Sequence, residues 1–248
     1  MTGLALLFIA ATFLRADLVL RLRLWLRPGS GIEAVSRLQK PIVRHIVRFA
    51  WFFTGFRIAV DPWIGPPLPG RLLLITNHQS LVDIPLLMWA FPRHDLRFVA
   101  KRELARYLPY ISLSLRQGGH AVISRTSDFR SGARAMARLA ELSARGISPV
   151  VFPEGTRSRT GKVGRFNSGA VRIILERAPL AVLSAAVDGG WRIGKTKGLL
   201  RNFGSTRYRI RLLALHPAPR GKREILETLG KVEQEIRSQM AAWEAAGA

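Results

Sequence analysis

The chain has 248 residues, no cysteine, and 39 lysines and arginines against 16 aspartates and glutamates, which gives a formal net charge of +23. The absence of cysteine excludes disulfides, zinc–thiolate sites and thiol catalysis, and a hydrophobic fraction of 48% indicates a folded core rather than disorder. So large a positive charge favours a polyanionic partner, either a nucleic acid or an anionic membrane surface.

The N-terminal 55 residues combine basic and apolar side chains. Residues 1–14 (MTGLALLFIAATFL) are uncharged, but they fall short of the roughly 20 residues of a spanning helix and lack the basic start of a secretory signal. Between Arg15 and Arg57, nine basic residues are interleaved with large apolar ones, a mixture that suits a lipid interface better than a DNA groove. We therefore expect residues 1–55 to form amphipathic, membrane-associated helices. The alternative is that these helices simply pack on the core.

Residues 56–248 repeat a pattern of apolar strand, loop and helix. The expected strands are 56–60, 72–76, 96–100, 121–124, 149–152, 180–187 and 206–215. The expected helices are 82–91, 102–116, 128–145, 168–177 and 222–245. This alternation predicts one α/β domain with a mostly parallel central sheet flanked by helices. In such sheets, ligands bind beyond the carboxyl ends of the strands.

The segment NHQSLVD (77–83) lies where the second expected strand ends and a helix begins. Two interpretations are open. Ser80 and Asp83 have the spacing of a helix capping box, in which His78 has no role. Alternatively, Asp83 orients the ring of His78, which then acts as a general base. Of the five histidines, only His78 has an aspartate five residues later.

Two further segments place polar residues after a strand. VVFPEGTRSR (150–159) turns at Glu154, Gly155, Thr156 and Arg157, where the glycine lets backbone N–H groups approach a ligand and the arginine can bind a phosphate or carboxylate. The alternative is a surface turn with a Glu–Arg pair. GGHAVISR (118–125) presents Arg125 at the end of a short strand. His78, Arg125 and Glu154 are thus expected to face one cleft.

Taken in this order, the patterns N-H-x4-D, G-x-x-V-I-x-R and F-P-E-G-T-R-S resemble the glycerophospholipid acyltransferases. They are most similar to the 1-acylglycerol-3-phosphate (lysophosphatidate) acyltransferases. The resemblance covers about residues 70–190 and includes AKREL (100–104) and RFNSGA (165–170). One departure is Ser184, which stands near the position of a second proline in a block that the family associates with acceptor and acyl-chain binding.

The resemblance implies a membrane-associated enzyme that moves a fatty acyl group from acyl-CoA or acyl carrier protein to the hydroxyl of 1-acyl-glycerol-3-phosphate, which gives phosphatidic acid. It implies His78 as the base and Asp83 as its orienting carboxylate. The substrate-binding residues that it implies are Lys101, Arg125, Glu154, Gly155, Thr156 and Arg157. The arginines are expected on the acceptor's phosphate, while Glu154 is expected to orient Arg157 or the acceptor's glycerol hydroxyl.

The same resemblance implies no metal and no cofactor besides the acyl donor as co-substrate. Its partners are a lipid membrane and a lysophospholipid acceptor, and we expect the cytoplasmic face of a bacterial inner membrane. Other lysolipids, such as a lyso-ornithine lipid, remain open as acceptors. A basic protein that binds nucleic acid or membrane without catalysis is the alternative from another class. No known nucleic-acid-binding motif occurs in the chain, so we expect no nucleic acid partner.

Overall fold

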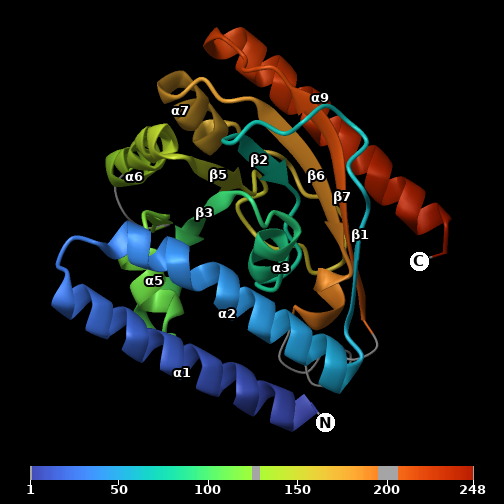
Figure 1. Ribbon diagram of the computed structural model, residues 1–248. Helices are drawn as coiled ribbons and strands as arrows, with labels where there is room; N and C mark the ends of the chain where they lie inside the picture. The colour runs from blue at the N-terminus through green and yellow to red at the C-terminus, as the bar shows by residue number, and fades with distance from the viewer. Residues whose placement is uncertain (1, 125–128, 195–205, 248) are drawn as a thin grey trace.

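The computed structural model describes residues 2–124, 129–194 and 206–247, and a seven-stranded sheet forms its centre (Figure 1). The strands are β1 (Arg57–Val60), β2 (Leu73–Thr76), β3 (Asp95–Lys101), β4 (Ala121–Ile123), β5 (Ile147–Val151), β6 (Val182–Asp188) and β7 (Arg207–His216). Their order in the sheet is β1-β7-β6-β2-β5-β3-β4. Neighbouring strands are parallel except for β6 and β7, which confirms the predicted mostly parallel sheet.

Helices cover both faces of this sheet (Figure 1). One face carries α6 (Phe129–Leu142), α7 (Gly169–Arg177) and α9 (Gly221–Ala245). The other carries α2 (Gly31–Thr54), α3 (Asp83–Ala90) and α5 (Ile111–Gln117), with α1 (Thr2–Leu26) outside α2. Side chains of β2 and of the residue before it alternate between the faces, so that Leu73 and Ile75 pack under α7 and α9 while Leu72 and Leu74 pack under α2 and α3. Because both faces are covered, the central strands are continuous apolar runs.

The prediction of a single helix over 102–116 was wrong. The structure divides this segment into α4 (Leu104–Tyr107) and α5, with Leu108 in an extended conformation between them. Pro109 follows Leu108, and a proline disfavours the helical conformation of the residue before it. The sequence therefore held the signal for this break.

A buried polar cluster attaches α2 to the sheet. The side chain of Arg97 in β3 is fully buried and donates hydrogen bonds to Asp95 (2.5 Å) and to Ser36 (2.6 Å) and Gln39 (3.2 Å) of α2. A buried guanidinium is costly when its partners are removed. Helix α2 is therefore an integral support of the sheet as well as a part of the N-terminal segment.

The topology brings three parts of the chain to one edge of the sheet. Strands β2 and β5 are adjacent and parallel, so the residues after Thr76 and after Val151 leave the sheet side by side. Strand β7 runs antiparallel to β6, with Arg209 opposite Asp188. The first residues of β7 therefore lie at the same edge, where β6 ends.

Candidate active site

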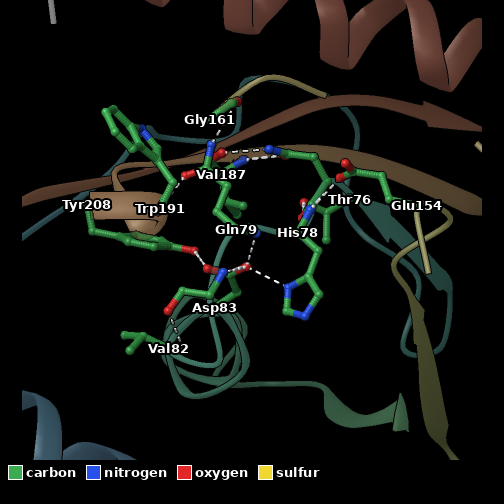
Figure 2. A network of polar contacts seen from close by, with 12 residues as sticks. Thr76, His78, Gln79, Val82, Asp83, Glu154, Gly161, Val187, Trp191 and Tyr208 are labelled. Carbon is green, nitrogen blue, oxygen red and sulfur yellow. Dashed lines mark hydrogen bonds and ion pairs between the residues drawn. The ribbon is translucent and has the colours of Figure 1, made fainter. Parts of the chain in front are cut away.

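His78 and Asp83 form a hydrogen-bonded pair at this edge (Figure 2). Nδ1 of His78 lies 2.7 Å from Oδ2 of Asp83. The carboxylate is fully buried, whereas the imidazole side chain is 13% exposed. Because an ionised carboxylate can only accept hydrogen bonds, Nδ1 carries the proton, and in the neutral imidazole Nε2 then has the lone pair. Figure 2 shows Nε2 on the side of the ring that points away from Asp83, where it can accept a proton from a ligand.

Asp83 also organises the loop that carries the histidine. Its Oδ2 accepts the backbone N–H groups of Gln79 (2.7 Å) and Ser80 (2.9 Å). The contact with Ser80 is one half of a capping box. The other half is absent, because the Ser80 hydroxyl accepts the N–H of Val82 at 3.3 Å. Asp83 thus fixes the turn and holds the imidazole at the same time, so the two interpretations of NHQSLVD do not exclude each other.

The second carboxylate oxygen has a partner that the sequence analysis missed. Oδ1 of Asp83 accepts the hydroxyl of Tyr208 at 2.7 Å, although the two residues are 125 positions apart. Burial raises the pKa of Tyr208 well above its usual value, and the negative charge of Asp83 raises it further. The phenol therefore stays protonated and donates.

The segment after β5 supports the histidine from its other side. The ring of Phe152 stacks on the imidazole with 4.0 Å between centroids. The backbone N–H of His78 donates to Oε1 of Glu154 at 2.8 Å, and the carbonyl of His78 accepts the N–H of Ser158 at 2.7 Å. Two of the three segments named in the sequence analysis are therefore in direct contact.

Glu154 is bonded to backbone groups that the sequence does not predict. Its Oε2 accepts the N–H of Gly164 at 2.7 Å, so both carboxylate oxygens are bonded to backbone N–H groups. Among the described residues it forms no ion pair with Arg157. Burial raises the pKa of Glu154, and the two N–H groups oppose this effect without cancelling it. Glu154 thus ties the turn after β5 to the loop after β2.

Of the remaining predicted site residues, three follow Glu154 on the turn after β5 and one lies at the end of β3. Gly155 adopts a positive φ of 64°, which residues with a side chain rarely adopt, and it presents Thr156 and Arg157 on an exposed turn. Lys101 is half-buried at the end of β3, and Arg125 lies outside the described residues. Within the described parts of the chain, no three His, Asp or Glu side chains gather as a metal site requires.

Ser184, the departure from the family pattern, lies inside the sheet. It is fully buried in β6 at a bulge against β7. Its hydroxyl accepts the N–H of Ala214 at 3.0 Å and donates to Glu235 of α9 at 2.5 Å. Ser184 therefore faces α9, on the opposite side of the sheet from α3.

An imidazole held by a buried carboxylate at the carboxyl edge of a mostly parallel sheet defines an α/β protein equipped for general-base chemistry. Comparison of the sequence with models of protein families identifies a similar family. Residues 66–187 match the family model described as Acyltransferase. This segment is therefore similar to the acyltransferase family, as the resemblance of its motifs predicts.

Similar proteins carry the name 1-acyl-sn-glycerol-3-phosphate acyltransferase. One from Cocos nucifera is 34% identical over 117 residues, which are 44% of this chain and 35% of that protein. One from Borreliella burgdorferi is 27% identical over 140 residues, 56% of this chain and 55% of that protein. The human beta form is 30% identical over 158 residues, 60% of this chain and 51% of that protein. The chain thus spans between about a third and about half of the length of these relatives.

The fold also has a counterpart among solved structures. The crystal structure of PlsC, the 1-acyl-sn-glycerophosphate acyltransferase of Thermotoga maritima, matches with a TM-score of 0.67. The match covers 99% of this chain and 98% of that chain at 21% identity. The two proteins therefore share their fold from the N-terminal helices to α9.

Proposed function

We propose that this protein transfers a fatty acyl group from an acyl thioester, acyl-CoA or acyl carrier protein, to the free hydroxyl of 1-acyl-glycerol-3-phosphate. The observation that carries the proposal is the 2.7 Å contact between His78 and Asp83. This contact lies inside the segment that is similar to the acyltransferase family, and similar proteins bear the name of that activity.

The chemistry requires a base because a glycerol hydroxyl is a poor nucleophile at neutral pH. In this reaction Nε2 of His78 accepts the hydroxyl proton while the oxygen bonds to the thioester carbonyl carbon. When the tetrahedral intermediate collapses, the C–S bond breaks and the imidazolium returns the proton to the departing thiolate. Asp83 stabilises the imidazolium in between, and such a base typically contributes about 10²–10⁴-fold. The acceptor alcohol takes the place of an enzyme nucleophile.

A lipid-product assay tests the proposal. Purified full-length protein is given lysophosphatidate or lyso-ornithine lipid in vesicles, each with acyl-CoA and with acyl carrier protein as donor, and products are identified by mass spectrometry. We expect phosphatidic acid from lysophosphatidate. Acylation of the lyso-ornithine lipid alone would keep the mechanism but replace the acceptor. A folded protein that acylates neither lipid with either donor would contradict the proposal.

We propose that Arg157 binds the acceptor's phosphate, because it is a cation on an exposed turn next to the site. Arg157→Ala should raise KM for lysophosphatidate by about tenfold or more and leave KM for the thioester nearly unchanged. The reason is that a hydrogen bond to a charged group contributes about 1.5–3 kcal/mol. The same result is expected for Arg125→Ala from the family resemblance.

Arg159→Ala is the matched control, since it removes the same charge from the same exposed turn. An equal rise of KM in the Arg157 and Arg159 variants would indicate a general electrostatic field rather than a phosphate contact. An unchanged KM for lysophosphatidate in Arg157→Ala would show that Arg157 does not bind the phosphate.

We propose that α1 and α2 place the protein on an anionic membrane surface. An exposed stripe of large apolar side chains runs along α1 at helical spacing. Its members are Leu4, Leu7, Leu14, Leu18, Leu22 and Trp25. The outward face of α2 adds the exposed basic residues Arg44 and Arg48. Apolar and basic side chains together favour an interface with anionic lipid. None of the described helices has the length and apolar character needed to cross a bilayer.

Substitution of the stripe tests this membrane contact. Deletion of residues 1–55 would uncover the buried Arg97, so we prefer the triple substitution of Leu7, Leu14 and Leu18 by serine. It should weaken binding to anionic vesicles by at least about tenfold, because each leucine loses a favourable transfer from water. Leu226→Ser in α9, at a residue that is 40% exposed, is the control. Unchanged co-sedimentation of the triple variant would mean that the membrane contact lies elsewhere.

A further inference from the structure

The two oxygens of the Asp83 carboxylate are bonded by different parts of the chain. Oδ2 accepts the ring N–H of His78 and the backbone N–H groups of Gln79 and Ser80. Oδ1 accepts the hydroxyl of Tyr208 at 2.7 Å. Figure 2 shows Tyr208 and His78 on opposite sides of the carboxylate. The imidazole and the phenol are therefore linked through a single charged group.

Tyr208 reaches Asp83 because of the direction of its strand. It is the second residue of β7, which enters the sheet at the edge where β6 ends. It pairs with Ile58 of β1, and its side chain is fully buried among the residues between the sheet and α3. Tyr208 lies outside residues 66–187, the part that matches the family model, so the family match assigns it no role.

The surroundings of Oδ1 leave little space for another donor. A Cβ atom added to Gly190 would lie 2.8 Å from this oxygen, so the backbone of the 3₁₀ turn Gly190–Ile193 closes over it. Among the described residues, Tyr208 is the side chain that donates to Oδ1. Removal of its hydroxyl would leave one oxygen of a fully buried carboxylate without that donor.

We propose that Tyr208 is a positioning residue of the active site, which acts through Asp83 on the orientation of the His78 ring and on the charge that faces it. This inference rests on the proposed function, in which His78 is the base.

The phenol has two physical effects on the pair. Its hydrogen bond opposes rotation of the carboxylate, so that Oδ2 stays directed at His78. It also takes up part of the negative charge, because a donor to an anion makes a strong, polarising hydrogen bond. Without this donor the carboxylate should stabilise the imidazolium more strongly.

Other charged groups around the pair stay in place when the hydroxyl is removed. Glu154 accepts the backbone N–H of His78, and the negative charge of the nearby Asp83 raises the pKa of Glu154. Asp188 lies near Tyr208 and is paired with Arg209 at 2.7 Å. Tyr208→Phe alters none of these groups, so a changed pH dependence can be assigned to the lost hydrogen bond.

Kinetics of full-length Tyr208→Phe, with lysophosphatidate and acyl-CoA between pH 5 and pH 9, test the proposal. We expect kcat to fall about tenfold, because a carboxylate that can rotate no longer holds the His78 ring in its reactive orientation, with KM for both substrates within about twofold of wild type. The acid limb of kcat/KM should move to higher pH. Tyr110→Phe removes the hydroxyl of a second buried tyrosine, which packs between α1 and α2. This control should leave kcat, both KM values and the acid limb of kcat/KM unchanged.

An NMR measurement separates this inference from the proposed function. The proton on Nδ1 of His78 can be identified by its loss in His78→Ala. Its resonance should change in Tyr208→Phe and stay in place in Tyr110→Phe. This readout needs no turnover, so a wild type that transfers no acyl group would refute the proposed function while the resonance still decides the role of Tyr208.

If Tyr208→Phe does not fold, 3-fluorotyrosine at position 208 provides the second variant. Fluorination makes the phenol a stronger donor, so the acid limb and the resonance should move in the direction opposite to that expected for phenylalanine. A folded phenylalanine or fluorotyrosine variant with the kcat, the acid limb and the Nδ1 proton resonance of wild type would overturn the proposal.

Discussion

His78→Ala should lower kcat by at least about a hundredfold at saturating substrates, because it removes the base that accepts the hydroxyl proton. The protein should stay folded and bound to vesicles. The side chain of His78 is partly exposed and contributes one ring contact with Phe152 and one hydrogen bond with Asp83. The packing of the sheet therefore does not depend on the His78 side chain. The test compares the wild type with His78→Ala in turnover and in circular dichroism.

His45→Ala is the matched control for this substitution. His45 is exposed on α2 and bonds to the carbonyl of Pro41, so its loss should leave kcat unchanged. A folded His78→Ala protein with turnover within a few-fold of wild type would show that His78 is not the base. The proposed acyltransferase mechanism would then fail as well.

Local sequence was sufficient for the parts of the site that depend on neighbours in the chain. All seven strands begin and end within two residues of the positions predicted from apolar runs. The contact between His78 and Asp83 spans a separation of five, and the expected end of the strand at Thr76 places both residues at the carboxyl edge. Such features depend on spacing, which the sequence displays directly.

Contacts between distant segments depend on the strand order, which local patterns do not encode. Glu154 reaches the N–H of His78 across 76 positions because β5 lies next to β2. Without that neighbour relation, the sequence predicts Arg157 or the acceptor's glycerol hydroxyl as the partner of Glu154. Tyr208 depends in the same way on the antiparallel direction of β7, and an aromatic residue in an alternating strand gives no signal of a carboxylate partner.

Asp83→Asn should lower kcat by about a hundredfold, the second-largest effect that we expect, because the buried charge that stabilises the imidazolium is lost. Measurement of kcat at saturating substrates checks it. Asp61→Asn is the control, since it neutralises an exposed carboxylate paired with Arg211 at 3.4 Å, and such pairs contribute little. A small loss of stability without loss of turnover in Asp83→Asn would indicate that Asp83 only caps the turn.

The structure also predicts which way the asparagine amide turns. At the position of Oδ2, the backbone N–H groups of Gln79 and Ser80 require an acceptor, so the amide oxygen should stay there. The NH2 group then takes the position of Oδ1, where the oxygen of Tyr208 can accept from it. In this arrangement His78 keeps its tautomer, and the lost turnover reports the missing charge.

A double-mutant cycle then asks whether Asp83 works through His78. If it does, Asp83→Asn should lower kcat by about a hundredfold in the wild type but hardly at all in His78→Ala, since no imidazolium remains to be stabilised. If Asp83 instead supports catalysis through the turn at Gln79 and Ser80, the substitution should reduce kcat by similar factors in both backgrounds. Additive losses would therefore contradict the role of Asp83 as the orienting carboxylate, and strong non-additivity would establish the pair as one catalytic unit.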